Sequence, residues 1–152
     1  MRKPSVRLSG IQISDFKNVR YGELNFNNRR KNYRASVLGL YGQNGSGKTA
    51  LIDALHLLKL LLCGKSVPKE MMELIYVGSD HAELSYRFDV ITPAGRYEAN
   101  YDLKLREEED ISEQNLETQG SSEKSFRLVV YDEVLGYSFE SSSEKIRKSP
   151  MI

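Results

Sequence analysis

The chain has 152 residues, 39% of them hydrophobic and 28% charged, which is the composition of one ordinary globular domain. Its single cysteine, Cys63, excludes an intrachain disulfide and a metal cluster built from cysteines. The most apolar run, residues 51–63, is too short to cross a membrane, and the first ten residues lack the apolar stretch of a secretory signal. We therefore expect a cytoplasmic protein with no membrane partner.

Positive charge is concentrated in the first third of the chain. Residues 1–50 contain ten Lys/Arg against two Asp/Glu, a net charge of +8, whereas residues 51–152 carry a net charge of −7. A basic segment suits a polyphosphate ligand, and it would also suit nucleic acid. The basic run within residues 29–34 has a plainer interpretation as a solvated loop, and the sequence leaves both open.

Three strands are predicted in the first 41 residues. Residues 6–14 are rich in β-forming side chains and residues 23–27 alternate, which predicts two strands with a turn over residues 15–21. Residues 37–41 are apolar at nearly every position. Such a pattern is typical of a central parallel strand that is buried on both faces.

A glycine-rich turn follows, and residues 49–63 then predict a helix. Its polar residues Asp53, His56 and Lys59 recur at every third position and mark one solvated stripe, while leucines cover the rest of the helix. Gly64 is placed to end the helix, because glycine tolerates the left-handed conformation found there. The expected order is strand, glycine turn and helix.

The second half of the chain predicts an antiparallel β region. Residues 82–90 and 97–105 alternate between apolar and polar side chains, and a turn over residues 92–95 joins them into a hairpin with one dry face. Further along the chain we expect a loose acidic segment over residues 106–125, strands over 126–131 and 137–140, and a tail without periodicity over 141–152.

A phosphate-binding motif connects the buried strand to the helix. Residues 42–49, GQNGSGKT, satisfy the pattern G-x-x-x-x-G-K-[ST]. Glycines at Gly42, Gly45 and Gly47 allow a tight turn and a close approach of the backbone to phosphate. Successive N–H groups and the positive end of the helix then surround the anion.

The last two motif residues have distinct expected roles. Lys48 should reach the β- and γ-phosphates as a point charge and stabilise charge in the transition state, and the Thr49 hydroxyl should ligate magnesium. The sequence therefore predicts a site for ATP with Mg²⁺. A glycine turn that binds nothing is the bland alternative, but it leaves Lys48 and Thr49 unexplained.

The motif and its surroundings resemble a known family. GQNGSGKTALIDAL is similar to the Walker A region of ABC-type ATPase heads in the SMC/RecF/OLD-like group, and IQISDFKNVRYGELNF resembles their opening strand, turn and second strand. The later hairpin and LVVYDEVLGYSF resemble AAA-like, OLD-related ATP-binding proteins. The resemblance implies an α/β fold, the N-terminal lobe of a P-loop NTPase. The nucleotide-binding residues that it implies, together with the motif, are Gly42, Gln43, Asn44, Gly45, Ser46, Gly47, Lys48, Thr49, Ala50, Lys17 and Asn18.

The resemblance also implies partners. Heads of this group complete their site with a signature segment and an acidic-ended strand from a C-terminal lobe, and two heads close on ATP. No LSGG-like run occurs in this sequence. We therefore expect residues 1–140 to form the N-terminal lobe and residues 141–152 a tail of a longer chain. Expected partners are the missing C-terminal lobe, a second ATPase head, and either DNA or a nuclease effector. The 152 residues alone should have weak ATPase activity or none.

Two acidic residues offer a different prediction. Leu128 to Glu133 (LVVYDE) fits the pattern of a Walker B strand, in which Asp132 would hold magnesium through water and Glu133 would polarise the attacking water. Arg127 and the alternation of the preceding residues favour an ordinary antiparallel strand instead.

Three functional hypotheses follow from these patterns. The first is an ATPase head, in DNA repair or phage defence, that hydrolyses ATP as a dimer. The second is a complete small P-loop NTPase or kinase that uses Asp132 and Glu133. The third is a non-enzymatic module in which nucleotide regulates nucleic-acid binding by the basic first third.

Overall fold

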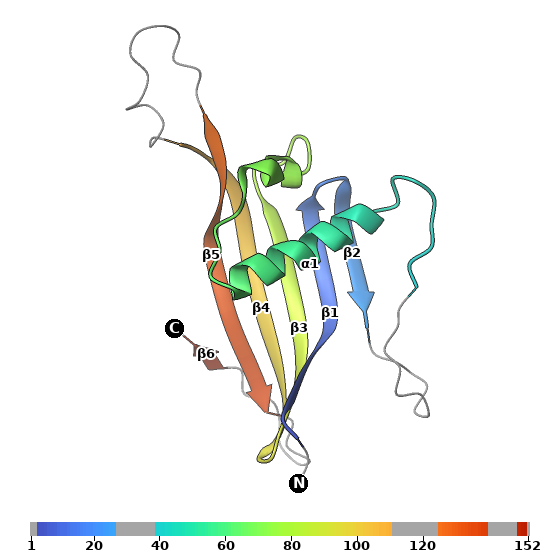
Figure 1. Cartoon of the computed structure of the whole chain (residues 1–152), viewed down its shortest axis with the longest axis vertical. Coiled ribbons are helices and arrows are strands. Elements are labelled where there is room, and N and C mark those ends of the chain that lie inside the picture. Colours follow the sequence, from blue (N-terminus) through green and yellow to red (C-terminus); the bar gives the residue numbers. More distant parts are fainter. Residues whose placement is uncertain (1–2, 27–38, 111–124, 140–148, 152) are drawn as a thin grey trace, which may run out of the picture.

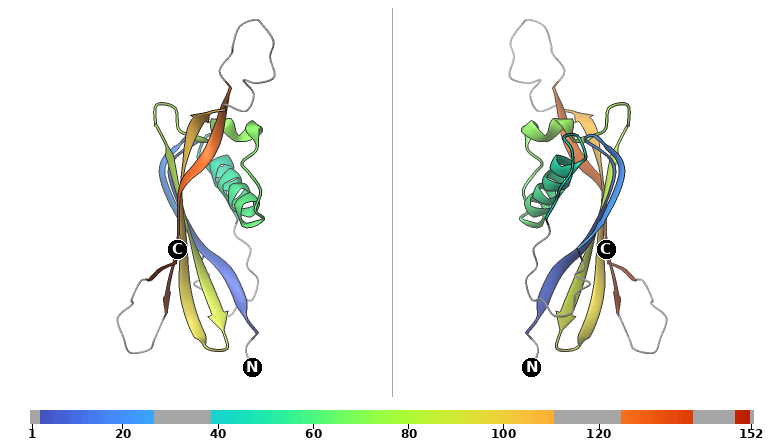
Figure 2. Two further views of the ribbon diagram at one scale, coloured as in Figure 1. Left: turned by 90° about the vertical axis from the view of Figure 1, so that its left-hand side faces the viewer. Right: turned by 90° about the vertical axis from the view of Figure 1, so that its right-hand side faces the viewer.

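The computed structural model describes residues 3–26, 39–110, 125–139 and 149–151, and it has one sheet with one helix lying across it (Figure 1). All neighbouring strands are antiparallel, in the order β2-β1-β3-β4-β5-β6. The side views show that helix α1 covers one face of the sheet (Figure 2). The elements are β1 (Ser5–Phe16), β2 (Val19–Asn25), α1 (Lys48–Leu62), a short 3₁₀ helix η1 (Lys69–Leu74), β3 (Ala82–Thr92), β4 (Gly95–Glu109), β5 (Phe126–Phe139) and β6 (Ser149–Met151).

The predicted central hairpin is confirmed. Strands β3 and β4 pair without interruption from Ala82 opposite Leu105 to Thr92 opposite Gly95. Every second side chain at the α1 end of the hairpin is buried, as the alternation predicts. These buried residues are Ala82, Leu84, Tyr86, Tyr101, Leu103 and Leu105. They form the buried face of the sheet on which helix α1 packs.

Helix α1 begins at the phosphate-binding motif and packs its apolar side on this face. Ala54 and Leu57 are fully buried, and the Tyr86 hydroxyl donates a 2.7 Å hydrogen bond to the Ala54 carbonyl. The helix ends as predicted at Gly64, which has φ of 67°. The Gly64 and Lys65 amides bond back to the carbonyls of Leu61 and Leu60, so the last turn is closed by a Schellman arrangement.

One strand prediction is wrong. Residues 39–41 do not form a strand, and Tyr41 is 96% exposed. A parallel strand that is buried on both faces needs hydrogen-bonded neighbours and covering layers, and the described sheet is antiparallel and gives these residues no strand partner. Residues 37 and 38 lie outside the described part of the chain.

Strand β5 corrects a second expectation. The two predicted strands, residues 126–131 and 137–140, belong to one strand, because residues 132–136 between them also pair with β4. Asp132 lies opposite Lys104, and a register shift beside this pair absorbs the one residue that breaks the alternation. Residue 140 lies outside the described residues.

Three boundaries of secondary-structure elements differ from the predictions. Residues 106–109, predicted as loose, continue strand β4 opposite the start of β5. Residues 19–21, predicted as turn, begin β2, and residues 149–151 of the predicted tail form β6 against β5. The expectations for residues 111–124 and 141–148 fall outside the described residues.

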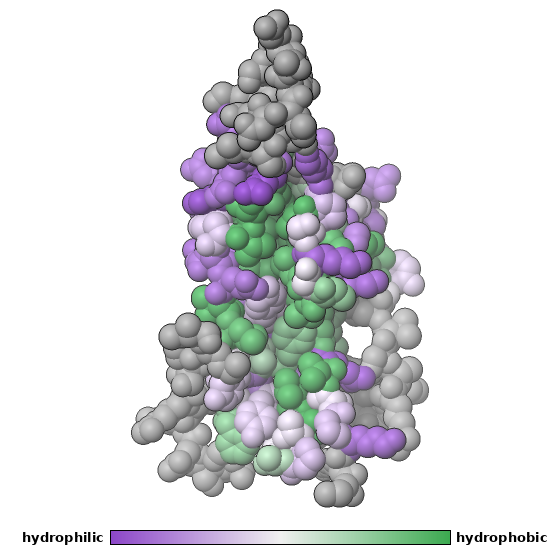
Figure 3. Space-filling view, turned by 60° about the vertical axis from the view of Figure 1, so that its left-hand side comes forward, coloured by the Kyte–Doolittle hydropathy of each residue, from purple (hydrophilic) through white to green (hydrophobic). Residues whose placement is uncertain are grey.

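The surface is uneven in hydropathy. Hydrophobic side chains form a band along the face shown in Figure 3, with hydrophilic side chains on both sides. Exposed hydrophobic residues of β5 include Leu135, Tyr137 and Phe139. Within the described ranges, no helix is both long enough and apolar enough to cross a membrane.

Candidate phosphate-binding site

The motif residues 42–47 form a loop that leads directly into α1, at the side of the sheet where β2 is the edge strand (Figure 1). Two glycines give the loop its shape. Gly45 and Gly47 have φ of 85° and 86°, in the left-handed region that side chains with a Cβ rarely adopt. At Gly42 an added Cβ would lie 2.7 Å from the Ser46 hydroxyl, so a side chain there would displace Ser46.

The loop is open on the Cβ side of Gly45, and the start of the helix is uncapped. Apart from Gly45 itself and its two neighbours in the chain, no heavy atom lies within 4 Å of the place where a Cβ would stand at Gly45. Gly47 is the N-cap residue of α1, with no side-chain cap, and the first turn contains no acidic residue. The first amides of a helix have no partner within the helix, so this terminus offers N–H groups and a positive dipole to an anion.

Lys48 folds back over the loop. Its ammonium donates hydrogen bonds of 2.7 Å to the carbonyls of Gly42 and Gln43, and one of 3.2 Å to the Ser46 hydroxyl. The positive charge therefore lies against the loop, on the carbonyls of Gly42 and Gln43. Thr49, the predicted magnesium ligand, is exposed, whereas the Ala50 side chain is fully buried in the core. Ala50 can contribute only its backbone to a ligand.

The turn between β1 and β2 packs against this loop. The Asn18 side-chain amide donates a 2.7 Å hydrogen bond to the Gly45 carbonyl, and Val19 lies so close to Gly47 that an added Cβ would stand 2.9 Å from its methyl group. Lys17 pairs with Asp53 of α1, and its side chain is 29% exposed. Lys17 is thus not a freely solvated turn lysine, and its contact with nucleotide stays a prediction.

The sequence placed Asp53 only on the solvated stripe of the helix and missed its ion pair. Asp53 follows Thr49 by four residues, so the two side chains lie on the same face of α1, one turn apart. The spacing of Thr49 and Asp53 could have indicated that Asp53 lies near the phosphate-binding loop. It could not identify Lys17 as the partner, because the pairing depends on how the β1–β2 turn lies on the helix.

Asp132 and Glu133 are not brought to the loop. They lie within β5, where Glu133 accepts a hydrogen bond from the Tyr101 hydroxyl and Asp132 faces the opposite side of the sheet from α1. Three strand spacings of roughly 4.8 Å separate β5 from β1, which is about 14 Å. Their catalytic role stays a prediction that this geometry does not favour.

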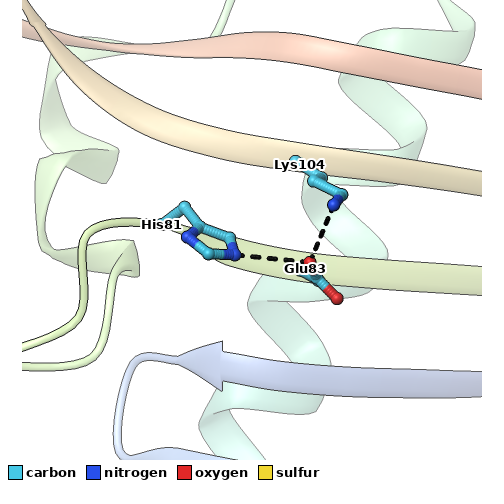
Figure 4. Close-up of polar contacts among 3 residues, drawn as sticks. All are labelled: His81, Glu83 and Lys104. Carbon is cyan, nitrogen blue, oxygen red and sulfur yellow. Dashed lines mark hydrogen bonds and ion pairs between the residues drawn. The ribbon is translucent and has the colours of Figure 1, made fainter.

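The face of the sheet away from α1 carries a second group of charges (Figure 4). Glu83 of β3 lies 3.0 Å from the Lys104 ammonium and 3.3 Å from His81 Nε2. The hydrogen bond from Lys104 lowers the pKa of Glu83, and the same contact raises the pKa of Lys104. A shallow hollow of about 420 Å³ lies beside them and includes Ser85 and Asp132 in its walls.

This polar face is not a metal centre in the part of the chain that the structure describes. No three His, Cys, Asp or Glu side chains are grouped closely enough there to hold an ion. The only magnesium ligand that the described residues offer beside the loop by motif is the Thr49 hydroxyl. Phosphate oxygens and water would fill the other coordination positions of Mg²⁺.

The left-handed glycines, the uncapped helix terminus and the lysine bonded to the loop are features shared with the P-loops of nucleoside triphosphatases. Comparison with known proteins agrees with this class. Residues 37–149 match the family described as "AAA domain, putative AbiEii toxin, Type IV TA system", and the chain belongs to that family.

One curated relative is similar to part of the chain. It is the DNA replication and repair protein RecF of Deinococcus radiodurans, which is 35% identical over 77 residues. The aligned segment is 51% of this chain and 19% of the relative, so the chain spans a small part of that protein's length. Together the two comparisons confirm the resemblance to an ABC- or AAA-like ATPase head of the SMC/RecF group.

Proposed function

We propose that the chain binds ATP with Mg²⁺ through residues 42–49. The observation that carries the proposal is the uncapped start of α1 behind a loop whose tip, at Gly45, is open. Such a terminus stabilises an anion through its N–H groups and its dipole. The positive charge of Lys48 against the same loop adds a second reason for a polyphosphate to bind there.

Each motif residue has a defined task in this proposal. The backbone from Asn44 to Ala50 surrounds the phosphates, and Lys48 exchanges its loop carbonyls for phosphate oxygens. Thr49 holds Mg²⁺, which supplies charge neutralisation between the β- and γ-phosphates when it is bound. Lys17, at the neighbouring turn, lies close enough to the start of α1 to approach the nucleotide if it leaves Asp53.

Calorimetry with ATP and MgCl₂ tests the proposal. The wild-type chain should bind with measurable heat, and Lys48→Ala should weaken binding at least tenfold, because a charge-assisted hydrogen bond contributes about 1.5–3 kcal/mol. Lys59→Ala is the matched control, since Lys59 is exposed on the same helix, three turns from the loop. A correctly folded wild-type chain that gives no heat would refute ATP binding.

We also propose that hydrolysis requires a second ATPase head. Asp53, beside the loop, is paired with Lys17, and Asp132 and Glu133 lie on β5, away from the loop. The chain alone should therefore turn ATP over slowly. Robust turnover that Lys48→Ala abolishes would show instead that the site is complete in these 152 residues, as in the small-NTPase hypothesis.

The comparisons also support a proposal about the partners of the whole protein. RecF is described as a DNA replication and repair protein, and the matched family's description names a toxin of a toxin–antitoxin system. We infer a head that acts as a dimer in the cytoplasm, in DNA repair or defence, with residues 1–140 as its N-terminal lobe. DNA binding whose affinity falls steeply with rising salt concentration would support a role in DNA repair, and no DNA binding at low salt would refute that role.

A further inference from the structure

The two-residue turn between β1 and β2 is held firmly in place. Phe16 pairs with Val19 across it, and Lys17 has φ of 54°, a conformation that residues other than glycine seldom adopt. On one side, the Lys17 amide donates a 2.7 Å hydrogen bond to the Leu74 carbonyl. On the other side, the Lys17 ammonium pairs with Asp53 of α1. The turn is therefore fixed to two separate elements.

From this fixed turn, Asn18 reaches the tip of the phosphate-binding loop. Its side-chain Nδ2 donates a 2.7 Å hydrogen bond to the Gly45 carbonyl. The peptide unit that contains this carbonyl also contains the Ser46 amide, which donates a 3.2 Å hydrogen bond to the Gln43 carbonyl. A peptide unit is planar, so bonds at both of its ends fix its orientation.

The orientation of this unit matters for the rest of the loop. Gly45 is left-handed, and glycine rotates more freely than any other residue when nothing restrains it. The amides that follow, from Gly47 into α1, are those that a phosphate would meet. Fixing the Gly45–Ser46 peptide therefore removes one of the rotations that could turn the following amides away from a phosphate.

We propose that Asn18 is a positioning residue that holds the phosphate-binding loop in its ligand-ready shape through the Gly45 carbonyl. It acts on the loop and makes no contact with the nucleotide itself. This inference rests on the proposed ATP binding, and it gives Asn18 a different role from the direct nucleotide contact that the family resemblance implies. Preorganisation of this kind strengthens binding by removing the ordering cost of the loop.

The experiment compares Asn18→Ala with Asn18→Asp. The first variant removes the amide, and the second keeps its shape but places a carboxylate oxygen against the carbonyl. Asn100→Ala is the control, because Asn100 lies within β4, opposite Gly136 and away from the loop. Affinities for Mg·ATP and for inorganic tripolyphosphate with magnesium are measured by calorimetry. Hydrogen exchange of residues 43–47 is followed in the nucleotide-free protein.

Both Asn18 variants should weaken ATP binding by about threefold to tenfold, the worth of one hydrogen bond, and should weaken tripolyphosphate binding by the same factor. Exchange in the loop should accelerate while exchange in β3 and β4 stays unchanged. A loss for ATP without a loss for tripolyphosphate would mean that Asn18 contacts base or ribose, and it would overturn the inference.

Two other results are informative. Unchanged affinity and loop exchange in both Asn18 variants, with normal binding by the wild type, would overturn the positioning role alone. Failure of the folded wild type to bind either ligand would overturn the proposed function, and the inference with it. The two failures are therefore distinguishable in one set of titrations.

Discussion

The Tyr86 hydroxyl makes a buried hydrogen bond between the sheet and the helix that carries the phosphate-binding loop, and Tyr86→Phe tests its contribution to stability. The side chain is fully buried and donates a 2.7 Å hydrogen bond to the Ala54 carbonyl. Phenylalanine keeps the ring and removes only the hydroxyl. The Ala54 carbonyl keeps its bond within α1, so no acceptor is left wholly without a partner.

The expected cost is therefore that of one ordinary hydrogen bond, about 1 kcal/mol in the free energy of unfolding. For a chain of this size such a change lowers Tm by roughly 2–4 °C. Urea and thermal unfolding monitored by circular dichroism measure it. The control is Tyr21→Phe, because Tyr21 is 63% exposed on β2, and its loss of a hydroxyl should change stability by less than about 0.5 kcal/mol.

Alkaline pH supplies an independent check. Burial raises the pKa of Tyr86 above its ordinary value of about 10, because the phenolate is disfavoured in the core. The folded state thus binds this proton more tightly than the unfolded state. The stabilisation that the protonated hydroxyl gives the folded state is therefore complete below pH 10 and is lost as pH rises above it. The stability gap between wild type and Tyr86→Phe should narrow above pH 10. Equal effects of Tyr86→Phe and Tyr21→Phe at neutral pH would refute the reasoning.

Three further substitutions have defined outcomes. Gly47→Ala should cost at least about 1 kcal/mol, because φ is 86° and the new Cβ would stand 2.9 Å from Val19, and it should weaken ATP binding in the same calorimetric assay; wild-type affinity would contradict this. Leu57→Ala, at a fully buried position, should lower the free energy of unfolding by about 2–5 kcal/mol in urea titrations, and a smaller loss would mean that the core collapses around the site. The pKa of Glu83 is lowered, mainly by its hydrogen bond from Lys104. The ionised Glu83 therefore stabilises the folded state above the ordinary carboxyl pKa, and this stabilisation is lost as pH falls below that value. Glu83→Gln should therefore differ from wild type by less than about 0.5 kcal/mol at pH 7 and by nothing near pH 2, and a gap that grows on acidification would show the opposite sign.

The local patterns of this sequence predicted the parts of the fold that local patterns determine. The alternation of apolar and polar residues alone located the β3–β4 hairpin, since its buried side chains all lie on the face that α1 covers. The helix and its end at Gly64 followed from the polar stripe and the left-handed glycine. The phosphate-binding motif was recognisable because glycine, lysine and threonine occur at fixed spacing.

Other parts depend on partners that are distant in sequence. The apolar residues 39–41 were predicted as a buried strand, but apolarity does not specify the neighbours that a strand needs. Strand β5 continues through Asp132 because Lys104, nearly thirty residues earlier, lies opposite it. The contact of Asn18 with Gly45 and that of Lys17 with Asp53 likewise join segments that only the folded chain brings together.

The hydrogen bond to Ala54 also has a mechanical meaning. Helix α1 has 15 residues and is therefore about 22 Å long, and Ala54 is its seventh residue, close to the midpoint. The loop lies at one end of this rod and the Gly64 turn at the other. Ala50 and Leu51 toward the loop end and Leu57 and Leu58 toward the other end are buried as well. The helix is therefore held along its whole length, and the loop end cannot be displaced without disturbing the packing of the helix on the sheet.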